Sequence, residues 1–340
     1  ASDLLAAAGF ETAILARDNA RPNLVTRLPG RGHAPPLLMY GHVDVVTTRN
    51  QAWTHPPFEG KVANGFVWGR GALDMKGGIA MMMAAIMRAK ATGLAPPGDV
   101  ILGLVSDEEA AGTSGAKYLI ENHAHLFEGV RYAISEFGGF STQIGGRKIY
   151  PIMIAEKQAC WLKATVRGQG GHGSMPVRGQ AMAKLARLLQ DLDRYRLPVH
   201  VPPAARQMIE GISSALPPMQ RILMRQLLKP VLTNSMLDLL GPSGKLLDPL
   251  LHNTVSPTIL QASDKCNVIP SEVKVELDGR LLPGYTPDDL VAELGQLLGD
   301  EVELSVVYFE PGPPDADMGL FDTLSGILRE ADPGGTPVPL

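Results

Sequence analysis

Short apolar runs alternate with longer helical patterns over the first part of the chain. Leu37–Tyr40, Val100–Val105 and Tyr132–Ser135 each have the pattern of a buried strand. Between them, Gly77–Ala91 is a Met- and Ala-rich helical pattern, and Ser114–Asn122 predicts a second helix. Strands that alternate with helices are typical of a mostly parallel sheet with helices on its faces, so the sequence predicts an α/β fold here.

The pattern changes after about Glu156. Ala159–Arg167 alternates apolar and polar residues like a half-exposed strand. Residues 198–250 are rich in Pro and Leu with weak periodicity, and they predict short helices. Two further strands are predicted, at Thr258–Ala262 and Val273–Arg280.

These patterns predict two domains. Residues 157–281 are expected to form an inserted α+β lid and dimerisation domain. Residues 1–156 and 282–340 then form a discontinuous catalytic domain, whose second part holds a predicted helix, strand and helix at Thr286–Leu298, Val302–Phe309 and Gly319–Ala331. The chain starts inside a helical pattern and stops at what resembles the entry to a strand, so we expect this domain to be incomplete at both termini.

Composition narrows the class of protein. Among 340 residues, 45% are hydrophobic and 19% are charged, which describes an ordinary globular chain. The net charge of −4 gives no basic footprint, so we expect no nucleic-acid partner. No stretch reaches the 18 or so apolar residues that span a bilayer, so we expect no membrane partner either.

Two cysteines, Cys160 and Cys266, lie far apart in the sequence and outside any metal-binding spacing. We expect buried free thiols rather than a disulfide or a zinc site. Free thiols are typical of a reducing compartment, so we expect a cytoplasmic location.

Carboxylates and one imidazole follow the apolar runs at the point where each strand ends. Glu108 and Glu109 follow Val100–Val105, His42-Val43-Asp44 follows Leu37–Tyr40, and Glu136 follows Tyr132–Ser135. Open α/β sheets bind ligands at the carboxyl ends of their strands. Adjacent carboxylates at such an edge repel one another unless a cation or a proton lies between them. Together these residues predict a metal site with a carboxylate base beside it.

Asp74 lies in the glycine-rich segment Gly69–Gly78, which opens a helix. Its glycines permit close backbone approach, which suits a carboxylate that bridges two metal ions. Each candidate also has a plain alternative when taken alone. Asp74 can be a helix N-cap, His42 a hydrogen-bonded loop residue, and Glu108-Glu109 a solvated loop pair. Their common position after successive strands favours the metal site.

The chain resembles the dinuclear zinc amidohydrolase and exopeptidase family of aminoacylase, acetylornithine deacetylase, succinyl-diaminopimelate desuccinylase, carboxypeptidase S and glutamate carboxypeptidase. The matching segments span most of the chain in the family's order: Gly41–Val46, Gly69–Gly78, Ser106–Gly115, Glu136, Gly171–Pro176 and Asn267–Pro270 through Asp278-Gly279-Arg280.

The resemblance implies two zinc ions, with cobalt or manganese as substitutes, held by four protein ligands. His42 and Glu136 would bind the first ion, Glu109 the second, and Asp74 would bridge the two. Asp44 would orient His42, and Glu108 would be the general base.

The resemblance also implies substrate contacts from the lid domain of a homodimer. His172 would donate to the oxyanion, in many members across the dimer interface, while Arg280 with Asn267 would hold the free carboxylate of a peptide or N-acyl amino acid. A guanidinium suits that task because it pairs bidentately with a carboxylate. The plain alternatives are a flexible-loop residue for His172 and a surface ion pair with Asp278 for Arg280.

One feature departs from the family pattern. The second zinc of the family takes a histidine near the C-terminus, but the last histidine of this chain is His252, inside the predicted lid.

The predicted function is hydrolysis of an amide or peptide bond next to a free carboxylate. The rival interpretations are a two-metal phosphoesterase, for which only Arg70 and Lys76 supply nearby cations, and a degenerate metal-binding or dimerisation protein.

Overall fold

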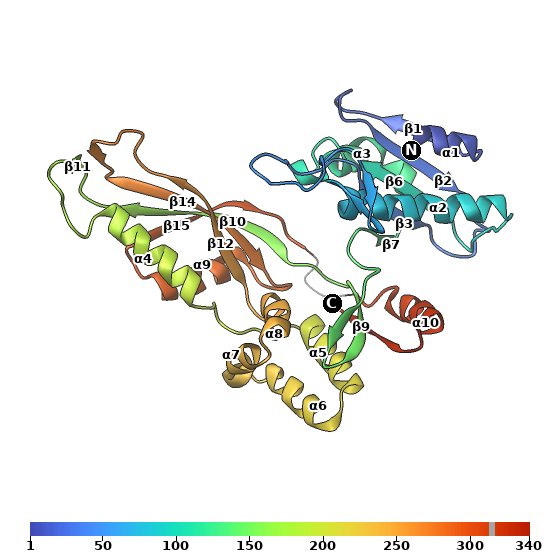
Figure 1. Ribbon diagram of the computed structural model, residues 1–340. Helices are drawn as coiled ribbons and strands as arrows, with labels where there is room; N and C mark the ends of the chain where they lie inside the picture. The colour runs from blue at the N-terminus through green and yellow to red at the C-terminus, as the bar shows by residue number, and fades with distance from the viewer. Residues whose placement is uncertain (313–316) are drawn as a thin grey trace. The chain divides into compact units, whose positions relative to one another are not determined.

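The computed structural model describes residues 1–312 and 317–340. The chain folds into two compact units, residues 1–137 and residues 138–340 (Figure 1). Within the described residues, no helix combines the length and apolarity needed to cross a membrane.

The first unit is built on a five-stranded sheet of order β1-β2-β6-β3-β7. The central strands β6 (Val100–Val105), β3 (Leu37–His42) and β7 (Tyr132–Ile134) are parallel. The strands β2 (Asn23–Leu28) and β1 (Thr12–Leu15) extend it as an antiparallel edge. The parallel strands therefore deliver their carboxyl ends to one edge of the sheet, as the sequence predicts.

Helices cover both faces of this sheet. The helices α1 (Ser2–Ala7) and α2 (Gly78–Ala91) pack on the face that carries Leu102 and Leu104 of β6. On the opposite face, α3 (Ala116–His123) packs through Leu119 against Ile101 and Val105. Because both faces are buried, β6 is a continuous apolar run instead of an alternating one.

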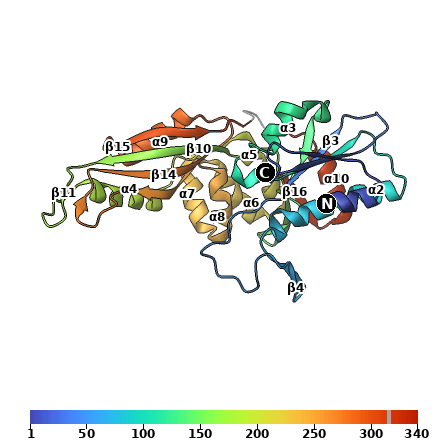
Figure 2. The ribbon, with the colours of Figure 1, turned by 90° about the horizontal axis from the view of Figure 1, so that it is seen from above.

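A small hairpin stands away from this sheet. It consists of β4 (Lys61–Ala63) and β5 (Phe66–Trp68), joined at Asn64-Gly65 (Figure 2). Both turn residues have positive φ, 52° and 80°, as a two-residue type I′ turn requires.

The second unit contains a four-stranded antiparallel sheet of order β12-β14-β10-β15. Its strands are β10 (Gln158–Arg167), β12 (Thr254–Gln261), β14 (Glu272–Leu281) and β15 (Val302–Phe309). With α4 (Ala181–Arg194) and α9 (Pro287–Leu298) they follow the order β-α-β-β-α-β of a split βαβ fold. Both helices cover the same face, where alternate residues of β10 and β14 form a continuous core.

Four short helices lie between α4 and β12 along the chain, within the segment where weak periodicity predicts short helices. Each has a proline at its first position: α5 (Pro203–Ala215), α6 (Pro218–Arg225), α7 (Pro230–Leu239) and α8 (Pro242–Leu247). Proline fits there because its missing N–H would have no partner in the first turn. The prolines that begin α6, α7 and α8 follow closely on the ends of the preceding helices, which interrupts the helical period of the sequence.

These helices share a core with a three-stranded sheet made of β8 (Thr142–Ile144), β9 (Arg147–Ile152) and β16 (Gly335–Pro339). The helix α10 (Phe321–Ala331) also packs against this small sheet.

The predicted fold class is confirmed: a mixed α/β sheet with a parallel centre and a separate antiparallel sheet with helices. β15 pairs with β10, so residues 302–309 join the strands of the predicted lid in one sheet. The division into a catalytic domain of residues 1–156 and 282–340 and a lid of residues 157–281 stays a prediction.

Cys160 is buried and free as expected, whereas Cys266 is free but exposed, so the expectation of a buried thiol there is wrong. Cys266 lies in the turn before β13 (Val268–Ile269), where no core surrounds it.

Candidate metal centre

His42 is the buried centre of a group of acidic side chains in the first unit. It is the last residue of β3 and only 1% exposed. Its Nε2 lies 3.0 Å from Asp74 Oδ1 and 3.0 Å from Glu136 Oε2. The ligand atoms of these three residues lie within 4.8 Å of one another, and so do those of His42, Glu108 and Glu109. The predicted ligands His42, Asp74, Glu109 and Glu136 thus all lie in groups that share the His42 imidazole.

The orientation of His42 follows from its other nitrogen. Nδ1 lies 3.1 Å from the Asp44 carbonyl oxygen and 3.6 Å from Asp44 Oδ1. A hydrogen bond from Nδ1–H to that carbonyl leaves the Nε2 lone pair facing Asp74 and Glu136. This is the arrangement that fixes the tautomer of a metal-binding histidine.

Asp44 also holds the loop that carries the glutamate pair. Its two carboxylate oxygens accept hydrogen bonds from the backbone N–H groups of Glu108 and Glu109, each at 3.1 Å. These residues begin the short 3₁₀ helix η2 (Glu108–Ala110) directly after β6. One side chain therefore ties the carboxyl ends of two neighbouring parallel strands together.

The turn that carries Asp74 packs against β3 beside His42. Asp74 belongs to the irregular turn η1 (Ala72–Gly77), and the peptide bond between Asp74 and Met75 is cis. Met75 is buried against β3 at Gly41, where a Cβ atom would lie 2.9 Å from Met75 Cε. The Met75 side chain thus fills the space above Gly41 and anchors the turn that carries Asp74 against β3.

The electrostatics of the group show how much negative charge gathers there. Burial raises the pKa of Glu108 and of Glu109, and neighbouring carboxylates, chiefly Glu136 for Glu108 and Asp74 for Glu109, raise it further. Burial opposes protonation of His42, yet its bond to the Asp44 carbonyl and the surrounding carboxylates raise its pKa overall. No lysine or arginine is among the groups that shift these pKa values most.

This donor set fits divalent zinc. Imidazole nitrogen and carboxylate oxygen are zinc ligands, and a cation would remove the repulsion that raises the carboxylate pKa values. No lysine or arginine is among the groups that shift the pKa values of Glu108 and Glu109 most, which also disfavours the phosphoesterase alternative. Of the two cations near the ligands in sequence, Arg70 donates to Gln51 and stacks on Trp53.

Asp107 is a buried acid that the sequence interpretation missed. It is 2% exposed, and its Oδ2 accepts a hydrogen bond from Ser114 N. Its Oδ1 is buried without a partner among the described residues, and Gly115 leaves it room, since a Cβ there would lie 2.3 Å from Oδ1. Its position directly before the glutamate pair could have indicated a role at the site. The alternation of apolar and polar residues does not distinguish a buried acid from a solvated loop residue there.

The residues predicted to contact substrate lie in the second unit, in two separate places. His172 and Asn267 are neighbours, because β11 (Gly171–His172) pairs with β13 and Gly173 N donates to Asn267 O at 2.8 Å. Arg280 lies elsewhere, since β14 carries the chain about 26 Å from Glu272 to Arg280. Asn267 lies beyond the Glu272 end, so Asn267 and Arg280 of one chain do not meet at one carboxylate.

Arg280 lies on the sheet face opposite α4 and α9. Its Nε and Nη2 lie 2.9 and 3.2 Å from the Asp278 carboxylate. Arg280 thus forms the surface ion pair that the sequence leaves open as an alternative to substrate binding. His172 is exposed and its Nδ1 lies 2.8 Å from Ser174 Oγ. His252 is committed elsewhere, to Asp248 and Asn234, and is not part of the metal group.

Comparisons of the chain with a family model and with curated relatives point to the same family. Residues 38–338 match the model of "Peptidase family M20/M25/M40". The chain is 29% identical over 302 residues to "Probable carboxypeptidase S-like 2" of Dictyostelium discoideum, covering 82% of this chain and 54% of that protein. It is 36% identical over 193 residues to succinyl-diaminopimelate desuccinylase of Paracoccus denitrificans, covering 56% and 49%. The chain thus spans about half the length of these curated relatives.

Among solved structures, human carnosine dipeptidase 1 has a similar fold. The TM-score is 0.60 at 17% identity, over 99% of this chain and 81% of that one.

The bonds of Asp44 generate a first prediction. Asp44→Ala removes no candidate ligand, but it frees the Glu108–Glu109 loop and the His42 ring. We expect zinc affinity to fall by about 10- to 100-fold, the usual effect of losing such a supporting residue. Competition with a chromophoric chelator measures it, with Glu128→Ala, an exposed acid of the same unit, as control. Unchanged zinc affinity in Asp44→Ala would show that the Glu108–Glu109 loop keeps its position without the Asp44 carboxylate.

Proposed function

Because the chain belongs to peptidase family M20/M25/M40, we propose that it is a zinc-dependent hydrolase of amide or peptide bonds next to a free carboxylate. It would act as an exopeptidase, a dipeptidase or an N-acyl-amino-acid deacylase. The observation that supports this most strongly is the ring of carboxylates around the buried His42 imidazole. The names of the relatives, a carboxypeptidase and a desuccinylase, support the same substrate class of small amino acid derivatives.

Four residues would hold the two ions. His42 and Glu136 would bind the first, Glu109 the second, and Asp74 both, because its carboxylate is within reach of His42 and is 61% exposed. When bound, the ions would supply the Lewis acidity that polarises the scissile carbonyl and acidifies a water molecule.

Glu108 is the proposed general base. It lies on η2, and its carboxylate oxygen lies within 4.8 Å of ligand atoms of His42 and Glu109, so it would be close enough to accept a proton from a water molecule held at the site. Glu108 would take a proton from the attacking water and then give it to the leaving nitrogen. The new C–O bond would form first, and the C–N bond would break once the nitrogen is protonated, so the products are a carboxylate and an amine.

We further propose that the active assembly is a homodimer formed through the antiparallel sheet. His172 and Asn267 at one end of the sheet would then serve one substrate, and Arg280 at the other end would serve another. The edge strand β12 supports a second copy, because it is exposed from Ser256 to Gln261 and includes the half-exposed Ile259 and Leu260. Open edges of this kind readily pair with another strand.

A second candidate function is a degenerate metal-binding or dimerisation protein. Within the printed 340 residues the last histidine is His252, so the histidine that the resemblance implies for the second zinc has no counterpart in this part of the sequence. Metal content and hydrolysis of a panel of dipeptides and N-acyl amino acids distinguish the two candidates. The two free thiols support a cytoplasmic setting for either.

The roles of the glutamate pair generate a second prediction. Glu108→Ala should remove nearly all turnover while zinc content stays close to wild type, because the base is not a ligand. Glu109→Ala should lower zinc occupancy. Plasma emission spectrometry after dialysis, alongside steady-state rates, measures both. The opposite pattern would mean that the two roles are exchanged.

The carboxylate contact generates a third prediction. Arg280 would bind the substrate carboxylate in the ground state and the transition state alike, so Arg280→Ala should raise KM far more than it lowers kcat. A substrate amidated at that carboxylate should be poor for the wild type. Lys274→Ala, on the same face of β14, is the control. Equal use of free and amidated substrates would remove Arg280 from recognition.

The sheet edge generates a fourth prediction. Leu260→Arg on β12 should convert the dimer to a monomer, because it places a charge in the apolar part of the proposed interface. Light scattering measures the mass, and Val307→Arg on the other edge strand, β15, is the matched control. If the control alone dissociates the dimer, the interface lies on β15.

A further inference from the structure

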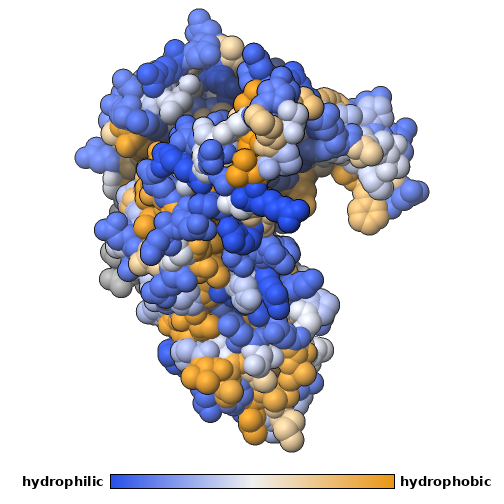
Figure 3. Space-filling model, turned by 90° about the vertical axis from the view of Figure 1, so that its left-hand side faces the viewer, coloured by the Kyte–Doolittle hydropathy of each residue, from blue (hydrophilic) through white to orange (hydrophobic). Residues whose placement is uncertain are grey.

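Helices α6 and α7 leave large apolar side chains uncovered. Met219, Ile222 and Leu223 lie on one face of α6, at spacings of three and four residues, and Met219 is 71% exposed. At the start of α7, Val231 is 93% exposed and Leu232 is 39% exposed. Figure 3 shows hydrophobic side chains gathered at the end of the molecule where these helices lie in Figure 1. Concentrated apolar exposure of this kind marks an interaction surface.

The charge along this segment has one sign. Residues 211–237 contain Arg221, Arg225 and Lys229 and no acidic residue. Arg221 is bound to carbonyl oxygens at the end of α5, including Ser213 O at 3.1 Å. Arg225 and Lys229 are exposed and have no ion-pair partner in the part of the chain that the structure describes. We call the exposed apolar and basic side chains of this segment the basic apolar face: Met219, Ile222, Leu223, Arg225, Lys229, Val231 and Leu232.

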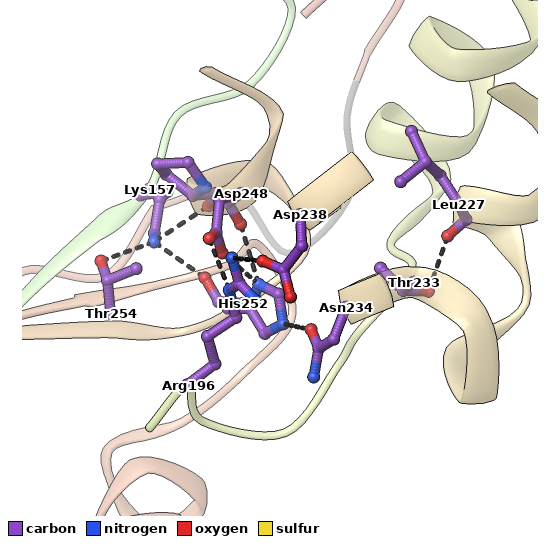
Figure 4. A network of polar contacts seen from close by, with 10 residues as sticks. Lys157, Arg196, Leu227, Thr233, Asn234, Asp238, Asp248, His252 and Thr254 are labelled. Carbon is purple, nitrogen blue, oxygen red and sulfur yellow. Dashed lines mark hydrogen bonds and ion pairs between the residues drawn. The ribbon is translucent and has the colours of Figure 1, made fainter. Parts of the chain in front are cut away.

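The nearest acids along the chain are Glu210 and Asp238, and neither forms an ion pair with Arg225 or Lys229 among the described residues. Asp238 and the next acid, Asp248, both pair with Arg196, at 2.8 and 2.6 Å (Figure 4). Asp248 also lies 2.7 Å from His252 Nδ1. The carboxylates of Asp238 and Asp248 are therefore already paired.

The inner side of the segment is firmly packed, so the face is built into the fold. Leu227 and Leu237 are buried, and so is Thr233. The Thr233 hydroxyl lies 2.9 Å from Leu227 O (Figure 4) and 3.0 Å from Lys229 O, which fixes the corner between η4 (Gln226–Leu228) and α7. This corner determines which side chains turn outward.

We propose that the basic apolar face docks on the surface of an anionic lipid bilayer. Short helices that combine apolar side chains with cations bind at the bilayer interface, where the apolar groups enter the acyl boundary and the cations meet lipid phosphates. A second copy on the same face is disfavoured, because a two-fold interface would bring Arg225 and Lys229 of both copies together. The proposal departs from the expectation of no membrane partner, which rested on the absence of a spanning segment and does not bear on surface binding.

Vesicle co-sedimentation tests the proposal with the intact chain. We expect binding to phosphatidylcholine vesicles that contain phosphatidylglycerol, weaker binding to phosphatidylcholine alone, and loss of the difference at high salt. The double variant Arg225→Glu/Lys229→Glu should lower the partition coefficient by about tenfold or more, since each basic residue near the surface contributes about fivefold. Ile222→Ser/Leu223→Ser should weaken binding to the same vesicles by removing the inserted groups.

The matched control is Ile327→Ser/Arg329→Glu, which makes the same changes at exposed positions of α10 and should bind like wild type. Circular dichroism and Tm show that each variant is folded. Equal binding to neutral and anionic vesicles, or equal loss in the control, would overturn the proposal. So would face variants that bind vesicles normally but change the mass in light scattering, because the face would then join two copies of the chain.

Discussion

Mutual repulsion among carboxylates around one buried imidazole is the constraint on which the rest of the first unit depends. Asp74, Glu108, Glu109 and Glu136 converge on His42, and no lysine or arginine is among the groups that shift the pKa values of Glu108 and Glu109 most. The parallel strands make this possible, because they bring three chain segments to one edge. Asp44 then supplies the opposing attraction, since its carboxylate binds two backbone N–H groups of the glutamate loop. A scaffold of this kind holds charges together that would separate in solution, which is the condition a divalent ion requires.

In the second unit, the length of the sheet keeps the candidate substrate-binding residues apart. Its strands β10 and β14 are both ten residues long, so side chains at opposite ends of the sheet cannot act on one small molecule. His172 with Asn267 and Arg280 therefore belong to different neighbourhoods of the same sheet. An exposed edge strand offers a way for two copies to combine these neighbourhoods, and the helices inserted before that strand add a separate, positively charged surface.

Most of this architecture could be predicted from the sequence, and the exceptions have physical reasons. The strand-end acids were predictable because apolar runs and helical patterns fix a parallel sheet, whose edge gathers them. The separation of Asn267 from Arg280 could not be predicted from the sequence, because it depends on how far β14 extends and on the pairing of β11 with β13. The burial of Asp107 could not be predicted either, because it depends on the packing of Gly115 and Ser114 around its carboxylate. The proline-initiated helices were predicted only as a group, since prolines interrupt the period.

The most direct test of this account is anomalous X-ray diffraction from crystals grown with zinc, recorded on both sides of the zinc absorption edge. The account predicts two peaks about 3.5 Å apart, both within bonding distance of Asp74, with His42 and Glu136 on one and Glu109 on the other. A single peak, or ions bound without His42 and Asp74, would contradict the two-metal centre and the hydrolysis proposed from it.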